Sequence, residues 1–249
     1  AAAGFTKAIA RERDNIFVKV VDFSSKEKPA SLASKLVDET LLDPAVMEVG
    51  WDGDQRFTLV LQDADIESTP THPLPQGAVF LVSGGTGGIT APILTDLAQH
   101  TQGHFYLLAR SKLPEKENPE LALLTNDPEQ LKFAILQRLS KNGQKATPAI
   151  INQEIAALER AAATLKTMET IQQFGGQAVY LPCDVSDAKA VKDVVDQILQ
   201  NEERVEVLIH AAGVEKSRKL ESKSEEEFRQ IINVKATGFF NLVKALEDA

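Results

Sequence analysis

Short apolar runs alternate with stripes of apolar residues at helical spacing over the second two thirds of the chain. The runs end at glycine or polar residues and predict buried strands at residues 78–82, 104–109, 178–182 and 205–209. A helical pattern follows each run, beginning at Ile89 after the first one. Strands that alternate with helices predict an α/β fold, a Rossmann-like parallel sheet with helices on both faces.

The first 66 residues show a different order of elements. The pattern predicts a helix end at 4–13, a strand at 15–23, a helix at 31–42, and a hairpin of strands 46–51 and 55–61 that turns at Asp52-Gly53. Residues 67–77 carry three prolines and are typical of a stiff linker. We therefore expect part of a smaller α/β subdomain at 1–66, a linker at 67–77 and an incomplete Rossmann-like subdomain at 78–249.

One connection of the expected sheet is unusually long. Residues 112–170 combine proline-containing loops with helical patterns, of which 131–139 and 150–168 are the most regular. We interpret this stretch as a helical insertion. Its alanine and leucine spacing favours packing over a cofactor site.

Composition and charge exclude several classes of protein. The chain has 43% hydrophobic and 25% charged residues, a formal net charge of −9 and a pI near 5.1, which argue against a nucleic-acid partner. No apolar run reaches membrane-spanning length, and the N-terminus does not resemble a signal peptide. The lone Cys183 is typical of a buried small hydrophobic residue and suits a reducing cytoplasm, where we expect the protein.

A glycine-rich turn joins the first strand of the Rossmann-like part to its helix. The turn comprises Ser83, Gly84, Gly85, Thr86, Gly87, Gly88 and Ile89. Glycine permits the backbone angles of such a turn and lets the backbone approach a pyrophosphate, whose charge lies among unpaired N–H groups at the helix N-terminus. Glycines also occur in ordinary hairpins, but their position between a strand and a helix favours dinucleotide binding.

Candidate cofactor contacts follow the second and third strands. Arg110, with Ser111 beside it, lies where the adenosine ribose of a dinucleotide binds, and an arginine there pairs with the 2′-phosphate of NADP. The alternative is a solvated surface arginine. Asp184 accepts a hydrogen bond from the adenine amino group, or caps the helix that opens near Ser186, or does both.

The fourth strand leads to two further groups of candidate residues. His210 is followed by small residues that leave room for ribose and nicotinamide, namely Ala211, Ala212 and Gly213. Because no second histidine or cysteine stands at metal-ligand spacing, we expect no metal site and a packed His210 bonded to the backbone. Lys235, in the next helix, either directs its ammonium toward the nicotinamide and lowers the pKa of a hydroxyl group or is a solvated surface lysine.

Five motifs in order resemble one known family: SGGTGGI, LLARS, CDVSD, HAAGV and NVKATG. Their spacing is similar to that of the ketoreductase domains of modular polyketide synthases and polyunsaturated fatty acid synthases, atypical members of the short-chain dehydrogenase/reductase superfamily. GFTKAIARE, VKVVDF and the hairpin at 51–61 look like the end of the non-catalytic structural subdomain of those domains. The resemblance covers nearly the whole chain apart from the helical insertion.

The resemblance implies an NADPH-dependent oxidoreductase within a multifunctional enzyme of polyketide or fatty acid biosynthesis. A hydride would reduce the β-carbonyl of an acyl chain tethered to an acyl carrier protein, among neighbouring synthase domains. The implied contacts are the pyrophosphate at 83–89, the 2′-phosphate at Arg110, the adenine at 184–185 and the cofactor ribose at 210–213. The adenine pair is Asp184 and Val185. Lys235 would be the catalytic lysine, which stands where ordinary short-chain dehydrogenases have an asparagine.

Three departures from the family pattern affect these expectations. Thr90 replaces the last glycine of the fingerprint, and the tripeptide at 215–217 stands where one stereochemical class carries an acidic motif, which leaves product stereochemistry open. The family's catalytic serine and tyrosine lie beyond the helix of Lys235, whereas this chain ends at Ala249. We therefore expect a fragment truncated at both ends that does not turn over alone.

Two other functions fit part of the pattern. A catalytically inactive scaffold or NADP-binding module of a synthase would also lack the serine and tyrosine. A free-standing extended short-chain enzyme, such as a sugar-nucleotide epimerase, explains neither the N-terminal part nor Lys235. The reductase of a multidomain synthase is therefore the favoured interpretation.

Overall fold

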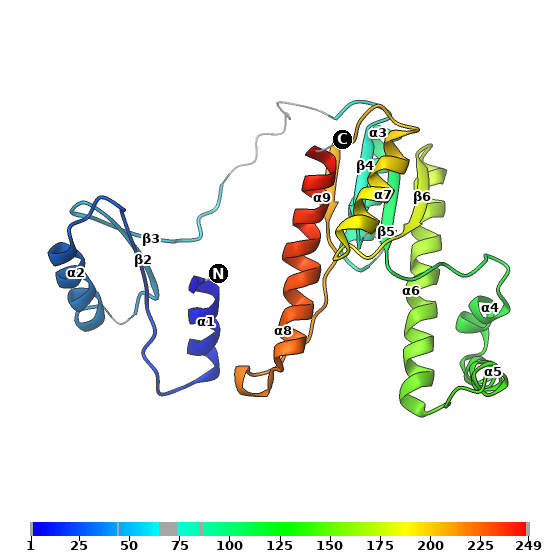
Figure 1. Cartoon of the computed structure of the whole chain (residues 1–249), viewed down its shortest axis with the longest axis horizontal. Helices are drawn as coiled ribbons and strands as arrows, with labels where there is room; N and C mark the ends of the chain where they lie inside the picture. The colour runs from blue at the N-terminus through cyan, green and yellow to red at the C-terminus, as the bar shows by residue number, and fades with distance from the viewer. Residues whose placement is uncertain (1, 44, 65–73, 85–86, 248–249) are drawn as a thin grey trace. The chain divides into compact units, whose positions relative to one another are not determined.

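The chain folds into two compact units (Figure 1). The computed structural model describes residues 2–43, 45–64, 74–84 and 87–247. One unit comprises residues 1–71 and 217–224, and the other comprises residues 72–216 and 225–249. Most of the predicted linker, from 67 to 73, lies outside the described residues. No helix in the described ranges is long and apolar enough to cross a membrane.

The smaller unit contains a three-stranded mixed sheet. Its elements are α1 (Ala2–Glu12), β1 (Val20–Phe23), α2 (Pro29–Leu41), β2 (Glu48–Asp52), β3 (Gln55–Thr58) and the 3-10 turn η1 (Leu220–Ser222). β1 pairs in parallel with β2, and β2 pairs antiparallel with β3, which gives the order β1-β2-β3. The predicted helix, strand, helix and hairpin are all present, with different boundaries.

Two details of the predicted pattern in this unit are wrong. Residues 15–19 are not part of a strand, because only Val20–Phe23 finds a hydrogen-bonding partner in β2. The hairpin turns at Gly53-Asp54 rather than at Asp52-Gly53, because Asp52 still belongs to β2. Gly53 has a left-handed φ of 53° in that turn, which glycine adopts without a steric penalty.

A buried ion cluster holds α2 against the sheet of this unit. The Glu39 carboxylate is 3% exposed and binds Lys19 Nζ and Arg56 Nε, both at 2.6 Å. The indole Nε1 of Trp51 donates a further hydrogen bond to Glu39 at 2.9 Å. The Arg56 guanidinium is the main reason that the pKa of Glu39 falls to about 2, although burial alone would raise it. The folded unit therefore keeps this carboxylate charged.

The larger unit is built on a parallel sheet in the order β6-β5-β4-β7. Its strands are β4 (Val79–Ser83), β5 (His104–Ala109), β6 (Gln177–Pro182) and β7 (Val207–His210). Its helices are α3 (Thr90–Thr101), α4 (Pro119–Asn126), α5 (Pro128–Lys141), α6 (Pro148–Gln173), α7 (Ala188–Leu199), α8 (Glu225–Ile232) and α9 (Gly238–Glu247), with the π-helical segment η2 (Asn233–Thr237) between the last two. The predicted Rossmann-like α/β fold is confirmed.

Helices cover both faces of this sheet (Figure 1), and alternate residues of the strands enter two separate cores, one on each face. Phe80 of β4 faces α3 and α6, and its ring stacks on that of Phe105 with centroids 4.4 Å apart. Val79 and Leu81, the neighbours of Phe80, face α7 and α9. A sheet that is buried on both faces explains why its strands are continuous apolar runs in the sequence.

The insertion between β5 and β6 forms a helical subassembly with a core of its own. The buried members of that core are Leu131, Ile135, Leu139 and Leu158. Arg138 of α5 joins the three helices, because its guanidinium donates to Glu120 of α4 and to Glu154 of α6, both at 2.8 Å. Farther along α6, Ile171 packs against the sheet. α6 therefore belongs both to the insertion and to the Rossmann-like core.

We expect Glu39→Gln to destabilise the smaller unit by about 3–5 kcal/mol, because the buried Lys19 ammonium would lose its counter-charge. Trp51 is the only tryptophan of the chain and is bonded to Glu39, so its fluorescence during urea unfolding reports on this unit. Folding lowers the pKa of Glu39 from 4.5 to about 2, so its stabilisation is complete above that upper value and is lost as the pH falls toward 2.

The matched control is Asp38→Asn at an exposed neighbouring position of α2. Its unfolding midpoint should stay close to that of the unaltered chain. Two results would contradict the role assigned to the carboxylate. One is an unfolding midpoint of Glu39→Gln equal to that of the unaltered chain, and the other is a loss of stability at low pH that is the same in both proteins.

Candidate functional site

A cavity of about 1430 Å³ lies along the carboxyl edge of the parallel sheet. The segments that follow all four strands line it, together with one side of α6. Ligands bind at this edge in open α/β sheets, because the loops after the strands meet there. The predicted site residues found in its wall are Gly84, Gly87, Gly88, Arg110, Ser111, Asp184, Val185, Ala211, Ala212 and Gly213.

The glycine turn after β4 passes very close to the segment after β7. Gly84 has a left-handed φ of 69°, and a Cβ there would lie 2.5 Å from the Ala212 nitrogen. Its N–H donates to the Leu108 carbonyl of β5 at 3.0 Å. The Ser83 carbonyl accepts a hydrogen bond from the Ala211 N–H at 2.8 Å. Only glycine fits at this position, which joins the ends of three neighbouring strands.

A partly buried chain of hydrogen bonds lies behind the cavity wall. The Ser83 hydroxyl and His210 Nδ1 are 2.6 Å apart, and His210 Nε2 lies 3.1 Å from the Val234 carbonyl oxygen. Because a carbonyl oxygen only accepts, His210 Nε2 carries a hydrogen and donates it to Val234. The prediction of a packed His210 bonded to the backbone is confirmed. The chain ties β4 and β7 to the start of η2.

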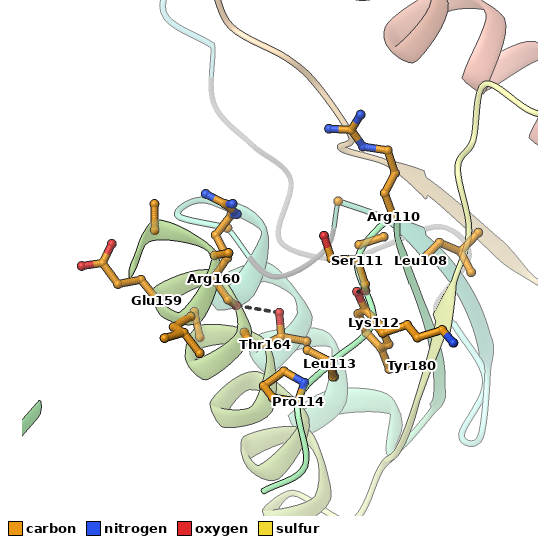
Figure 2. Close-up of a pocket in the computed structure, with 18 of the residues that line it drawn as sticks. Leu108, Arg110, Ser111, Lys112, Leu113, Pro114, Glu159, Arg160, Thr164 and Tyr180 are labelled. Atoms are coloured by element: carbon orange, nitrogen blue, oxygen red, sulfur yellow. Dashed lines mark hydrogen bonds between the residues drawn. The ribbon is translucent and has the colours of Figure 1, made fainter. Parts of the chain in front are cut away.

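The segment after β5 carries the predicted 2′-phosphate contacts. Arg110 and Ser111 are exposed residues of the cavity wall, and Arg110 forms no ion pair with any described residue. Figure 2 shows both on the segment that leaves β5, across the cavity from α6. The Tyr180 hydroxyl of β6 donates to the Ser111 carbonyl oxygen at 2.5 Å. This bond anchors the segment to the sheet.

Asp184 and Val185 follow β6 and line the cavity. Asp184 Oδ1 accepts from the Ser186 hydroxyl at 2.7 Å and from the Ser186 N–H at 2.9 Å. The hydroxyl bond is the main cause that lowers the pKa of Asp184, and the nearby charge of Arg110 adds to it. Asp187, rather than Asp184, caps α7, because its carboxylate accepts from the first backbone N–H groups of that helix.

Lys235 lies in η2, a π-helical segment of the kind that often occurs at functional sites. Its side chain is 52% exposed, and its Nζ lies 4.0 Å from Glu215 Oε2. Its Cε lies against Gly213, where a Cβ would be 3.2 Å away. The ion pair of Lys235 with Glu215 is exposed to solvent and therefore contributes little to stability. Lys235 is not part of the cavity wall, and its catalytic role stays a prediction.

The remaining predicted residues lie outside that wall. Ser83 and His210 lie behind it, and the Ile89 side chain is 82% exposed. Gly85 and Thr86 are outside the described residues. The sequence does not predict the contribution of α6, whose residues 156–161 and 163–164 line the cavity. An alanine-rich helical stretch indicates packing, and nothing in its spacing shows that a cavity lies beside it.

Cysteine and metal chemistry find no support in the part of the chain that the structure describes. No group of three or more histidine, cysteine, aspartate or glutamate side chains there could hold a metal ion. Cys183 is 4% exposed, and its burial, with smaller effects from Asp184 and Asp187, raises the pKa of the thiol to about 11. Such a thiol stays protonated at neutral pH, so the prediction of a buried, unreactive Cys183 is confirmed.

Solved structures identify the class of fold. The chain matches a ketoreductase domain from the bacillaene assembly line with a TM-score of 0.69 and 20% identity, over 99% of this chain and 47% of that one. An N-terminal ketoreductase from the macrolactin assembly line gives a TM-score of 0.63 and 16% identity, over 99% of this chain and 40% of that one. The sheet and its edge therefore have the architecture of ketoreductase domains, a short-chain dehydrogenase/reductase type of fold.

The family model of the KR domain matches residues 78–249, and the chain belongs to this ketoreductase family. One subunit of the polyunsaturated fatty acid synthase of Thraustochytrium sp. is 29% identical over 256 residues, which cover 99% of this chain and 9% of that protein. Polyketide synthase PksN of Bacillus subtilis is 22% identical over 242 residues, which cover 97% of this chain and 4% of that protein. The chain thus spans less than a tenth of these relatives, and the predicted family is confirmed.

We expect Gly84→Ala to destabilise the larger unit by about 2 kcal/mol or more, because the new Cβ would collide with Ala212 in a left-handed conformation. Thermal unfolding followed by circular dichroism measures the loss. Gly87→Ala in the same turn is the matched control, since a Cβ at Gly87 meets no atom within 4 Å. The same melting temperature for both variants would be incompatible with this close approach.

Proposed function

We propose that this chain belongs to a reductase that uses NADPH to convert the β-keto group of an acyl chain on an acyl carrier protein into a hydroxyl group. The observation that carries the proposal is the cavity at the carboxyl edge of a KR-family sheet, with Arg110 in its wall. Two relatives named as synthases support a place among the domains of a multidomain synthase.

The residues of the cavity fit NADPH. A volume of about 1430 Å³ exceeds the roughly 300–1,000 Å³ of common small-molecule sites, as a dinucleotide requires. Gly87 and Gly88 line it just before α3 begins, where a helix N-terminus attracts the pyrophosphate. The guanidinium of Arg110 would pair with the 2′-phosphate, and Asp184 would accept from the adenine amino group. When bound, NADPH supplies the hydride, and these residues hold and orient it.

Lys235 would assist the proton transfer to the oxygen of the reduced carbonyl. Its side chain extends over Gly213, the last of the predicted ribose-lining residues. A positive charge close to a hydroxyl group lowers the pKa of that hydroxyl. The Lys235 ammonium would thereby help such a group to give its proton to the oxygen of the reduced carbonyl.

A second function, an NADP-binding module without turnover, is favoured by one observation. Lys235 does not line the cavity, and its ammonium is near Glu215 instead. In that case the domain would bind the cofactor and serve the architecture of a synthase. Cofactor binding and turnover distinguish the two functions, so the two experiments below measure them separately.

We expect the unaltered chain to bind NADPH more tightly than NADH and Arg110→Ala to remove most of that preference. Loss of a charge-assisted contact to a phosphate lowers affinity about 10- to 100-fold. Isothermal titration calorimetry with each cofactor measures the ratio. Arg11→Ala, at an exposed position of the smaller unit, is the control and should leave the ratio unchanged. A preference that survives Arg110→Ala would overturn the cofactor assignment.

Turnover is measured as NADPH oxidation with a small β-ketoacyl thioester in the full-length protein that carries this domain. We expect Lys235→Ala to lower kcat about 100- to 10,000-fold, the usual contribution of a positioned acid–base group, with NADPH binding retained. Lys244→Ala, at an exposed position of α9, should leave kcat unchanged. An unaltered protein that binds NADPH without turnover would favour the non-catalytic module.

A further inference from the structure

The cavity wall holds cations that differ in how they are paired. Its basic residues are Arg110, Lys112, Arg138 and Arg160. Arg138 is neutralised by Glu120 and Glu154, each at 2.8 Å. The Lys112 ammonium points away from α6 in the close-up view (Figure 2). Arg110 and Arg160 form no ion pair with any described residue, although Asp184 lies close enough to Arg110 for the two charges to interact.

The two packing roles of α6 fix the place of Arg160. Leu158 packs into the core of the insertion, and Ile171 packs against the sheet, so the helix is held on both sides of Arg160. One turn later, the Thr164 hydroxyl donates to the Arg160 carbonyl oxygen at 2.8 Å. The neighbouring cavity residues are small, which leaves room around the long side chain: Ala156, Ala157, Ala161 and Ala163.

Arg160 and Arg110 come from opposite walls of the cavity. Figure 2 shows Arg160 on α6 and Arg110 across from it on the segment that leaves β5, with the Glu159 carboxylate directed away from that segment. Arginine binds phosphate through two parallel N–H···O bonds, which makes this pair suited to a phosphomonoester rather than to a small halide.

We propose that Arg160 is a second determinant of cofactor specificity, which binds the 2′-phosphate of NADPH from the side opposite Arg110. The inference rests on the proposed function, because it places NADPH in the cavity. It also assigns a role to the insertion: α4 and α5 hold α6 so that this helix presents a cation to the cofactor. The expectation that the insertion serves packing then holds for its leucines but not for Arg160.

Adenosine 2′,5′-bisphosphate and adenosine 5′-monophosphate differ only in the 2′-phosphate, so the ratio of their affinities isolates this contact. We expect Arg160→Ala to weaken binding of the bisphosphate about tenfold and to leave binding of the monophosphate unchanged, by calorimetry on the chain itself. Arg160→Lys should retain part of the affinity ratio, since the lysine ammonium keeps the positive charge but lacks the planar guanidinium that forms two parallel hydrogen bonds to phosphate. Lys166→Ala, an exposed cation on the same helix outside the cavity wall, is the matched control.

The outcomes separate this inference from the proposed function. If Arg160→Ala keeps the ratio of the unaltered chain while Arg110→Ala lowers it, the role of Arg160 is overturned and NADPH binding stands. If the unaltered chain binds neither the bisphosphate nor NADPH, both proposals are overturned. Arg160 is exposed, so its replacement should not unfold the domain, and an unchanged melting temperature verifies this. Arg160→Glu should lower the affinity for the bisphosphate further than Arg160→Ala does, because the new carboxylate repels the 2′-phosphate.

Discussion

Parallel pairing of the four strands is the constraint on which the site depends. The register places Ser83 of β4 beside Leu108 of β5 and beside His210 of β7, so three consecutive strands of the sheet end at one level. Each chain segment that leaves this edge must cross over before the next parallel strand can begin. The segments therefore start side by side, and residues more than a hundred positions apart in sequence share one cavity wall. The bare backbone of Gly84 lets two of them approach to contact distance.

The insertion is tied to this arrangement through a single helix. A helical pair attached only by loops would have no fixed relation to the sheet, but α6 is continuous from the core of the insertion to the core beneath β5. Arg138 strengthens the link by joining α4, α5 and α6 through two carboxylates. The long connection thus gives the cavity a second wall that the strand ends alone do not supply.

The sequence predicts the elements better than it predicts how they meet. β5 has the predicted bounds because glycine precedes it and a cation follows it, whereas the strand expected from residue 15 begins only at Val20, where β2 offers a partner. The burial of Cys183 and the backbone bond of His210 could be predicted because each follows from local context. Arg160 could not, since an arginine on an alanine-rich helix has the same local pattern whether it faces solvent or a cavity. The capping residue of α7 could not be predicted either. Asp184 and Asp187 are three residues apart, and the exact start of the helix decides that Asp187 caps it.

Charge pairing separates the groups that hold the fold from those that face the cavity. The chain carries 36 acidic and 27 basic residues, so its overall field repels an anionic ligand, and attraction must come from local cations. Glu39 and Arg138 are saturated by partners, and each joins helices or strands that would otherwise separate. A cation intended for a phosphate must instead lack a strong carboxylate partner, because breaking such a pair on binding would offset the energy of the new contact. Arg110 and Arg160, which form no ion pair with any described residue, meet this condition for the proposed phosphate contact.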